Sequence, residues 1–229
     1  MRRFPLAAMA ALILALPANA PAAPPSMPIQ PGAQVTTPAG SCTLNFVFQE
    51  SSGTKYIGTA GHCGTVGQVA RTPSPRRDIG PIVWSQNQAA PGIDFALIRI
   101  DPARYSEVEP SVRMYGGPTG STDEADTNTG DMLYVTGYGI GFGSTEVTRH
   151  RFGVLVRDDD NEYVADMVAV QGDSGGPVLH GRTGAALGTI SRFNLPSSTD
   201  IGPTVSRILE RLRANGYPTL FLVTAPLAI

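Results

Sequence analysis

The sequence predicts an all-β protein, a sandwich or a barrel, with one helix near its C-terminal end. The 26 glycines and 20 prolines are about 20% of the 229 residues, against a usual share of about 12%. Such a composition favours short elements joined by tight turns. Many short runs alternate apolar and polar side chains, and no helical segments alternate with them. No repeat of fixed period stands out.

The composition excludes several classes of protein. Hydrophobic residues make up 41% of the chain, which is too many for a disordered protein. Only 16% of the residues are charged and the formal net charge is −2, so no basic surface for nucleic acid is expected. No apolar run reaches the roughly 20 residues of a membrane-spanning helix.

The first 20 residues have the features of a signal peptide. Arg2 and Arg3 precede an apolar stretch, residues 6–16, that is too short to span a bilayer. Residues 18–20 (Ala-Asn-Ala) form a cleavage site of the small-x-small type, and residues 20–22 form a competing one. An uncleaved anchor is the alternative. We expect a secreted protein, extracellular, periplasmic or associated with the cell wall, with no membrane span after cleavage.

Export from the cytoplasm predicts the redox state of the two cysteines. Cys42 and Cys63 would meet an oxidising compartment, where a disulfide is expected. In the chain-entropy model, closing this loop stabilises the fold by roughly 3 kcal/mol. Two free buried thiols are the alternative. Two cysteines cannot make the common structural zinc site and no histidine pair has ligand spacing, so no metal is expected.

Changes in amino-acid composition along the chain predict its segments. Residues 21–40 contain six prolines and predict an extended linker or a short pro-segment. The main domain would be residues 41–229. Its first β half would cover about residues 41–115 and its second about residues 130–202. A polar connection at residues 116–131 would join the two halves. A calcium site in this connection is disfavoured, because its acidic residues do not match the EF-hand spacing.

The strands are predicted from alternation and from the turns between them. Leu44, Phe46 and Phe48 alternate with polar neighbours and indicate a half-buried strand, which residues 55–60 would follow. Further strands are expected at residues 66–70, 79–85, 93–100, 132–136, 147–157, 163–170, 177–180 and 185–191. The acidic run at residues 158–162 is expected at the tip of a hairpin.

One helix is predicted at about residues 203–215. Val205, Ile208, Leu209 and Leu212 have the i, i+3, i+4, i+7 spacing of an apolar stripe. Pro203 suits its first turn, and the Asn-Gly pair at residues 215–216 suits its end. The tail from residue 217 carries no charged side chain and has no predicted place.

The sequence Gly-Asp-Ser-Gly-Gly-Pro at residues 172–177 is the strongest chemical signal. A serine between glycines in a tight turn exposes both its hydroxyl and nearby backbone N–H groups, which a serine nucleophile needs. A plain glycine turn is the alternative. The Gly-x-Ser-x-Gly pattern of α/β-hydrolases is excluded, because it needs strand-turn-helix context and an Asp followed by a distant His. After Ser174 the only histidine is His180.

A general base must therefore precede Ser174. His62 follows a predicted strand and adjoins Cys63, whereas His150 has the context of a strand surface and His180 that of a structural residue. The acid that orients the histidine ring is expected to be Asp94, the one charged residue at the beginning of an apolar predicted strand. A buried aspartate needs a hydrogen-bonding partner, and an imidazole N–H is a suitable one. An exposed aspartate at a strand edge is the alternative.

The order His62, Asp94, Ser174 is that of the chymotrypsin fold. With Thr-Ala-Gly-His-Cys at residues 59–63 and the serine motif, the chain resembles bacterial secreted members of the chymotrypsin/trypsin-like serine peptidases over about residues 41–215. This resemblance implies two perpendicular six-stranded antiparallel β-barrels and a C-terminal helix. His62 and Asp94 would come from the first barrel and Ser174 from the second.

The resemblance also implies the roles of the residues. Ser174 would attack the scissile carbonyl, His62 would carry the proton, and Asp94 would steady the imidazolium. The backbone N–H groups of Gly172 and Ser174 would form the oxyanion hole. No cofactor is implied, the substrate would be a protein or peptide, and a monomer is expected.

Specificity and activation depart from the family pattern. Val168, six residues before Ser174, would form the floor of the specificity pocket, and Ser191 and Phe193 would line it. An apolar floor predicts a preference for apolar side chains, since it cannot neutralise a buried cation. No activation junction precedes the first strand, so Asp173 needs a partner other than a new chain terminus.

These features predict a secreted serine endopeptidase that acts through an acyl-enzyme. Two alternatives stay open. One is a catalytically weak binding or adhesion protein on a protease fold, and the other is a narrow esterase that uses the same serine.

Overall fold

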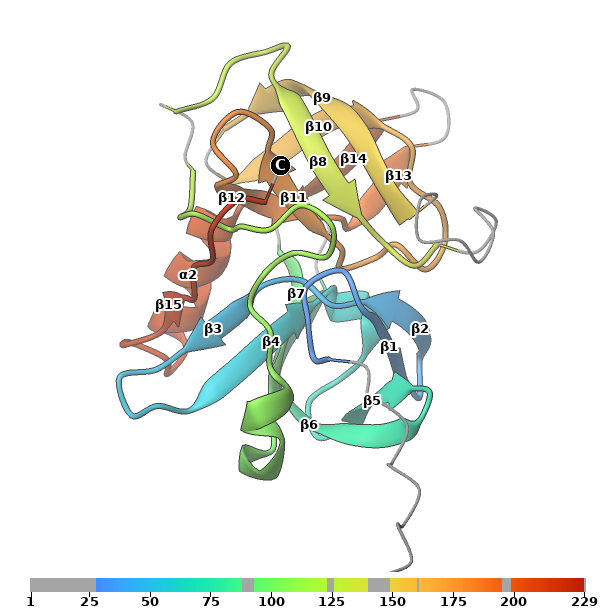
Figure 1. Cartoon of the computed structure of the whole chain (residues 1–229), viewed down its shortest axis with the longest axis vertical. Helices are drawn as coiled ribbons and strands as arrows, with labels where there is room; N and C mark the ends of the chain where they lie inside the picture. Colours follow the sequence, from blue (N-terminus) through green and yellow to red (C-terminus); the bar gives the residue numbers. More distant parts are fainter. Residues whose placement is uncertain are drawn as a thin grey trace, which may run out of the picture.

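The computed structural model describes residues 28–87, 93–122, 126–139, 149–159, 161–194 and 199–228. The predicted signal peptide, residues 1–20, lies outside this part of the chain. Two β-sheets lie one above the other, with the first half of the chain below and the second half above (Figure 1).

The first sheet is antiparallel and has the order β15-β3-β4-β7-β6-β5-β1-β2. A 3-10 helix, η1, spans Gly61–Cys63 between β4 and β5, and another, η2, spans Pro102–Glu107 after β7. The strands are β1 (Gln34–Thr37), β2 (Gly40–Thr43), β3 (Val47–Gln49), β4 (Lys55–Thr59), β5 (Val69–Pro73), β6 (Arg76–Asn87), β7 (Asp94–Arg99) and β15 (Phe221–Leu222).

The second sheet is also antiparallel, with the order β12-β11-β8-β9-β10-β14-β13. Asp158 and Glu162, the ends of the acidic run, lie in β9 and β10 of one hairpin, where Asp158 pairs with Tyr163, as predicted; residue 160 lies outside the described residues. The strands are β8 (Met132–Thr136), β9 (His150–Asp158), β10 (Glu162–Met167), β11 (Pro177–His180), β12 (Ala186–Thr189), β13 (Arg192–Asn194) and β14 (Thr199–Pro203).

The predicted all-β, chymotrypsin-like class with a C-terminal helix is confirmed. The strand counts differ from six in each half: in the described residues the first sheet has eight strands and the second has seven. One reason is that the C-terminal tail returns as β15 and pairs with β3. This pairing joins residues about 170 positions apart, which no local pattern reveals.

The segment before residue 41 differs from the predicted linker. Val35 of β1 is fully buried between the half-buried Gln34 and Thr36, and Ile29 is buried as well. The alternation in β1 is the ordinary signature of a strand, but the surrounding prolines masked it. Residues 34–37 therefore form a strand of the first sheet, and Ile29 packs in its core.

The first predicted strand, around Leu44, Phe46 and Phe48, also differs from the prediction. Residues 43–48 are buried throughout rather than alternately, and the ladder is interrupted between β2 and β3. Both faces are covered, because Leu44 packs in the core of the first sheet while Phe46 packs in a second core.

The second core joins the two sheets and the helix. It contains Phe46 and Phe95 from the first sheet, Leu179 from the second, and Ile208 from α2 (Val205–Ala214). A third core fills the second sheet around Tyr163. The shared core fixes how the two halves sit against each other, and this determines the geometry between them.

Helix α2 begins at Val205, two residues later than predicted. Thr204 is its N-cap, and the Thr204 hydroxyl accepts a hydrogen bond of 3.2 Å from the Arg207 N–H. Pro203 is the last residue of β14 rather than part of the first helical turn. The predicted apolar stripe is buried as expected.

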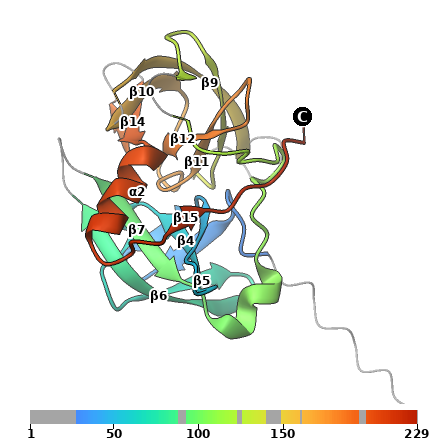
Figure 2. The same ribbon diagram turned by 90° about the vertical axis from the view of Figure 1, so that its left-hand side faces the viewer.

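The C-terminal tail, for which the sequence made no prediction, forms a strap across the molecule (Figure 2). After β15, the N–H of Val223 donates to Val47, and the carbonyl of Pro226 accepts from Gly117 in the connection between the halves. A Cβ at Gly184, in the β11–β12 turn, would lie 2.6 Å from Leu227. The strap thus contacts both halves and their connection.

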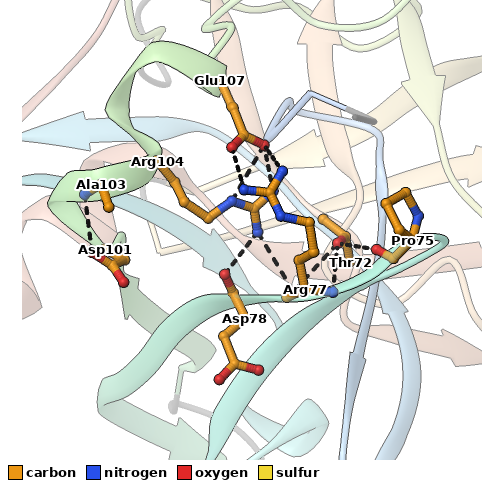
Figure 3. A network of polar contacts seen from close by, with 8 residues as sticks. All are labelled: Thr72, Pro75, Arg77, Asp78, Asp101, Ala103, Arg104 and Glu107. Atoms are coloured by element: carbon orange, nitrogen blue, oxygen red, sulfur yellow. Dashed lines mark hydrogen bonds and ion pairs between the residues drawn. The ribbon is translucent and has the colours of Figure 1, made fainter. Parts of the chain in front are cut away.

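An ion-pair network around the buried Arg104 fastens η2 to the β5–β6 hairpin (Figure 3). Arg104 is buried, donates to the backbone carbonyl of Asp78 at 2.7 Å and pairs with Glu107 at 2.7 Å. Arg77 pairs with the other oxygen of Glu107. The hydrogen bonds from Arg104 and Arg77 outweigh burial and lower the pKa of Glu107 to about 2.

Candidate active site

The loop that carries His62 is tightly held. It forms η1 directly after β4, and the Ser85 hydroxyl donates to the carbonyls of Gly61 and Gly64 at 3.1 and 2.8 Å. A Cβ at Gly61 would lie 2.0 Å from the Gln86 carbonyl oxygen, so only glycine fits there. Cys63 forms the predicted disulfide with Cys42, with a Cα–Cα distance of 6.3 Å.

Asp94, the first residue of β7, holds the His62 ring. Its Oδ2 lies 2.7 Å from His62 Nδ1, and its Oδ1 accepts the His62 backbone N–H at 2.8 Å. The Ser191 hydroxyl also donates to Oδ2, at 2.6 Å. Asp94 and Ser191 are buried. An ionised aspartate places the ring proton on Nδ1, which leaves Nε2 free to accept a proton.

The contact between His62 and Asp94 shifts the pKa of each residue. The hydrogen bond to Asp94 raises the pKa of His62 above 6.5, although burial opposes this. Burial acts to raise the pKa of Asp94, but the hydrogen bonds from His62 and Ser191 outweigh it and lower the pKa below 3.8. His62 is therefore a stronger base than a free imidazole, and Asp94 stays ionised.

The loop around Ser174 packs against the His62 region. The Ser174 carbonyl accepts the Thr43 N–H at 2.9 Å and lies 4.0 Å from Cys63 Sγ, one residue from His62. A Cβ at Gly175 would lie 2.4 Å from the Thr43 carbonyl oxygen. The structure thus brings the serine loop of the second half to the histidine loop of the first.

Two backbone donors in this loop have no partner in the part of the chain that the structure describes. Gly172 has a φ of 104°, a conformation that glycine adopts without strain. Within the described residues, the N–H groups of Gly172 and Ser174 donate no hydrogen bond, whereas the N–H groups of Asp173, Gly175 and Gly176 each do. Unused neighbouring donors beside a serine are what an oxyanion requires.

Asp173 finds its partners inside the second half. Its fully buried carboxylate lies 2.9 Å from a guanidinium nitrogen of Arg151 on β9, and accepts from the N–H groups of Gly139 and Val170 at 2.7 and 2.9 Å. These contacts give Asp173 the partner that the sequence analysis expected it to need. The carboxylate of Asp200 interacts electrostatically with Asp173 and has no hydrogen-bond partner in the described region. Burial, chiefly, raises the pKa of Asp200 to about 7.

Val168, the predicted floor of the specificity pocket, does not lie in a pocket beside the serine loop. The Val168 side chain is 57% exposed and lines a groove on the outer face of the second sheet with Phe152 and Val154. The reason is the strand period: Tyr163, Ala165, Met167 and Ala169 point inward, so Val168 points outward. The sequence shows this alternation, but both sets of alternate residues are largely apolar, so it does not show which set faces the core.

Ser191 and Phe193, the other two predicted pocket residues, lie at and in β13. The Ser191 hydroxyl is committed to Asp94, a contact that the sequence analysis missed because nothing local links positions 94 and 191. Phe193 is the middle residue of β13, where it pairs with Asp200.

A cavity of about 440 Å³ opens beside His62. Apart from His62 itself, its lining carries no charged side chain: it consists of Ala39, Gly61, Gly64, Thr65, Val66, Gln68, Ser85 and Asn87. This space could hold neutral portions of a substrate next to the base.

The other histidines have structural partners. Thr136 Oγ1 lies 3.1 Å from His150 Nδ1, and the buried His180 lies between Thr183 at 2.8 Å and Asp131 at 3.0 Å. Within the described residues, the one cluster with metal-ligand atoms is Cys42, His62 and Cys63. Both sulfurs are joined in the disulfide and are not thiolate ligands.

Comparisons with known proteins agree with this geometry. The family model described as Trypsin matches residues 19–206. Serine protease 2 of Streptomyces fradiae is 29% identical over 154 residues, which are 65% of this chain and 85% of that protein. The structure is similar to that of Thermobifida fusca Protease A, with a TM-score of 0.61, 25% identity, and coverage of 86% of this chain and 98% of that one.

A second solved structure shows the same fold. Nocardiopsis Protease is 23% identical, has a TM-score of 0.58, and is matched over 85% of this chain and 98% of its own. The family match covers most of the chain and includes His62, Asp94 and Ser174. The chain therefore belongs to the trypsin family of serine proteases and is a serine endopeptidase.

Proposed function

We propose that Ser174, His62 and Asp94 form a catalytic triad that hydrolyses peptide bonds through an acyl-enzyme. The observation that carries this proposal is the 2.7 Å contact between His62 Nδ1 and Asp94 Oδ2, beside a serine loop with unused N–H donors. In chemical terms, this arrangement supplies a base, its orienting acid and an oxyanion hole at one place.

The steps follow from the positions of these groups. The Ser174 oxygen adds to the scissile carbonyl carbon while its proton passes to His62 Nε2. The carbonyl oxygen becomes an oxyanion that the N–H groups of Gly172 and Ser174 stabilise. His62 then gives its proton to the leaving amine as the C–N bond breaks. Water repeats the sequence, with the serine as leaving group, and releases the acid.

The substrate is a protein or peptide, as the family membership implies. We propose that the enzyme acts outside the cytoplasm as a monomer, after removal of residues 1–20. The N-terminal segment and the two bacterial protease relatives support this location. No helix in the described residues is long and apolar enough to cross a membrane.

A fluorophosphonate probe tests the proposal directly. It labels a serine only when the hydroxyl is activated. We expect labelling of the wild-type protein and none of Ser174→Ala. Absence of labelling in correctly folded wild-type protein would support the alternative of a binding or adhesion protein on a protease fold.

Protein substrates compared with simple esters separate an endopeptidase from a narrow esterase. The cavity beside His62 favours the endopeptidase, because it leaves room for residues flanking the scissile bond. Hydrolysis of esters with no cleavage of casein or peptide libraries would favour the esterase.

The predicted preference for apolar side chains depended on Val168 as a pocket floor. Because Val168 lies on the outer face of the second sheet, its position gives this preference no support. The preference stays a prediction, and profiling with a peptide library decides it. Dominant cleavage after Lys or Arg would contradict it.

A further inference from the structure

Thr43, at the end of β2, contacts the serine loop with its main chain and its side chain. Thr43 is 0% exposed. Its N–H donates to the Ser174 carbonyl at 2.9 Å, and its hydroxyl donates to the Gly172 carbonyl at 2.8 Å. The hydroxyl also accepts the Tyr138 N–H at 2.9 Å, and the Thr43 carbonyl accepts from the Thr59 hydroxyl at 2.8 Å. Every polar group of this residue is used.

These contacts span the two halves of the molecule. Thr43 and Thr59 belong to the first sheet, whereas Gly172 and Ser174 belong to the loop of the second half, and Tyr138 follows β8. Thr43 and Gly172 are separated by 129 positions in the sequence. One buried residue of the first half therefore holds both residues whose N–H groups are the unused donors beside the serine.

The loop needs such a restraint because of its glycines. Gly172 has a φ of 104°, and glycine populates a wide range of backbone angles at little cost. Each peptide unit is planar and joins the carbonyl of one residue to the N–H of the next, so Thr43 fixes the planes that follow Gly172 and Ser174. These two planes flank the peptide plane that carries the Ser174 N–H. The first of them also adjoins the plane that carries the Gly172 N–H, so holding both limits the directions in which these two N–H groups can point.

We propose that Thr43 is a positioning residue that sets the orientation of the two oxyanion-hole N–H groups. This inference rests on the proposed function, which assigns that role to Gly172 and Ser174. The alternative is that Thr43 is an ordinary buried threonine that contributes to stability alone.

Thr72 on β5 provides a matched control (Figure 3). It is also buried, with 3% exposure. Its hydroxyl donates to the Pro75 carbonyl at 2.8 Å and accepts the Arg77 N–H at 3.2 Å, all within the β5–β6 hairpin. Replacing either threonine by valine removes a buried hydroxyl with one donated backbone bond and one accepted backbone bond, but only Thr43 contacts the serine loop.

The experiment compares Thr43→Val, Thr43→Ser and Thr72→Val in the full-length protein. For Thr43→Val we expect kcat to fall about 10- to 100-fold, below the 10²- to 10³-fold cost of deleting an oxyanion donor, with KM nearly unchanged. Thr43→Ser keeps the hydroxyl and should restore most of kcat. Thr72→Val should lower Tm without changing kcat per active site.

A peptide aldehyde gives a readout that a structural role would not change. The serine oxygen adds to the aldehyde carbon, the serine proton passes to His62, and the aldehyde oxygen becomes an oxyanion. Thr43→Val should weaken aldehyde binding by the same factor as kcat, and the acid limb of the pH profile should stay in place. End-point titration with a fluorophosphonate normalises every rate to the folded fraction, and Thr43→Ala serves as a second variant if the valine protein folds poorly.

Two results would overturn the positioning role. One is a Thr43→Val protein with kcat and aldehyde affinity within about twofold of those of Thr72→Val. The other is a loss that appears in KM alone. Failure of the proposed function is distinguishable, because the wild-type protein would then show no fluorophosphonate labelling at all.

Discussion

The carboxylate of Asp173 lies 2.9 Å from the guanidinium of Arg151, and both side chains are largely buried next to the proposed nucleophile. The pair links strand β9 to the residue directly before Ser174. The serine loop is thus anchored from two sides, by Arg151 within the second half and by Thr43 from the first.

Arg151→Met should destabilise the protein and distort the serine loop. Removing one partner of a buried ion pair leaves an uncompensated charge, which typically costs about 3–5 kcal/mol. We expect a clearly lower free energy of unfolding in urea and a reduced kcat. Arg157→Met is the control, since Arg157 forms an exposed pair with Asp159 and such pairs contribute about 0–1 kcal/mol. Equal stability of the two variants would contradict the anchoring role.

Ser174→Ala and His62→Ala should each lower kcat by at least about 10⁴-fold, because the triad residues act as a unit. Circular dichroism and Tm should stay close to those of the wild-type protein. The double variant should lose little more than either single one. Retention of a tenth of the activity in either single variant would rule out the proposed roles.

The acid limb of kcat/KM should lie above pH 6.5. Only neutral His62 accepts the serine proton, and the hydrogen bond to Asp94 raises the pKa of His62, so the rate rises with pH through a value above the ordinary one. In Asp94→Asn the residual activity should titrate at a lower pH, since the raising contact is lost. A profile that is flat from pH 5 to 8 would argue against a histidine base.

Asp200→Asn should stabilise the folded protein at pH 8. Burial raises the pKa of Asp200 to about 7 from an ordinary value of 3.8, so between these values the unfolded chain releases a proton that the folded protein keeps. The contribution of Asp200 to the free energy of unfolding of the wild-type protein therefore falls as pH rises from about 4 to 7, by up to roughly 4 kcal/mol.

The test of Asp200 is urea unfolding of the wild-type and variant proteins at pH 4.5 and pH 8. The advantage of Asp200→Asn should appear at pH 8 and nearly vanish at pH 4.5. Asp166→Asn, which removes an exposed carboxylate from β10 of the same sheet, is the control. An advantage of equal size at both pH values would contradict the assignment of the titrating group.

Replacement of Cys42 and Cys63 by alanine should cost roughly 3 kcal/mol in the chain-entropy model. Because Cys63 adjoins His62 and lies 4.0 Å from the Ser174 carbonyl oxygen, activity should fall as well. Peptide mass spectrometry without reduction should show the crosslinked pair. Two alkylatable thiols in the native protein would show that Cys42 and Cys63 are not crosslinked.

Local patterns in the sequence determined much of this protein. Alternation placed the strands at residues 132–136 and 177–180 at their observed bounds, and the i, i+3, i+4, i+7 stripe placed the buried face of α2. The His62 and Asp94 pairing was predictable because each residue had an unusual local context: a histidine next to a cysteine, and a lone charge in an apolar strand. These signals act over a few residues, through backbone period and burial.

The tertiary structure alone decided the remaining features. The Asp173–Arg151 pair, the Ser191 hydrogen bond to Asp94, the Thr43 contacts with the serine loop and the C-terminal strap all join residues far apart in the chain. Such contacts depend on how the two sheets pack around their shared core, and no local period encodes that packing. The outward position of Val168 lies between these cases: its alternation was present in the sequence, but only the packed sheet showed which face was buried.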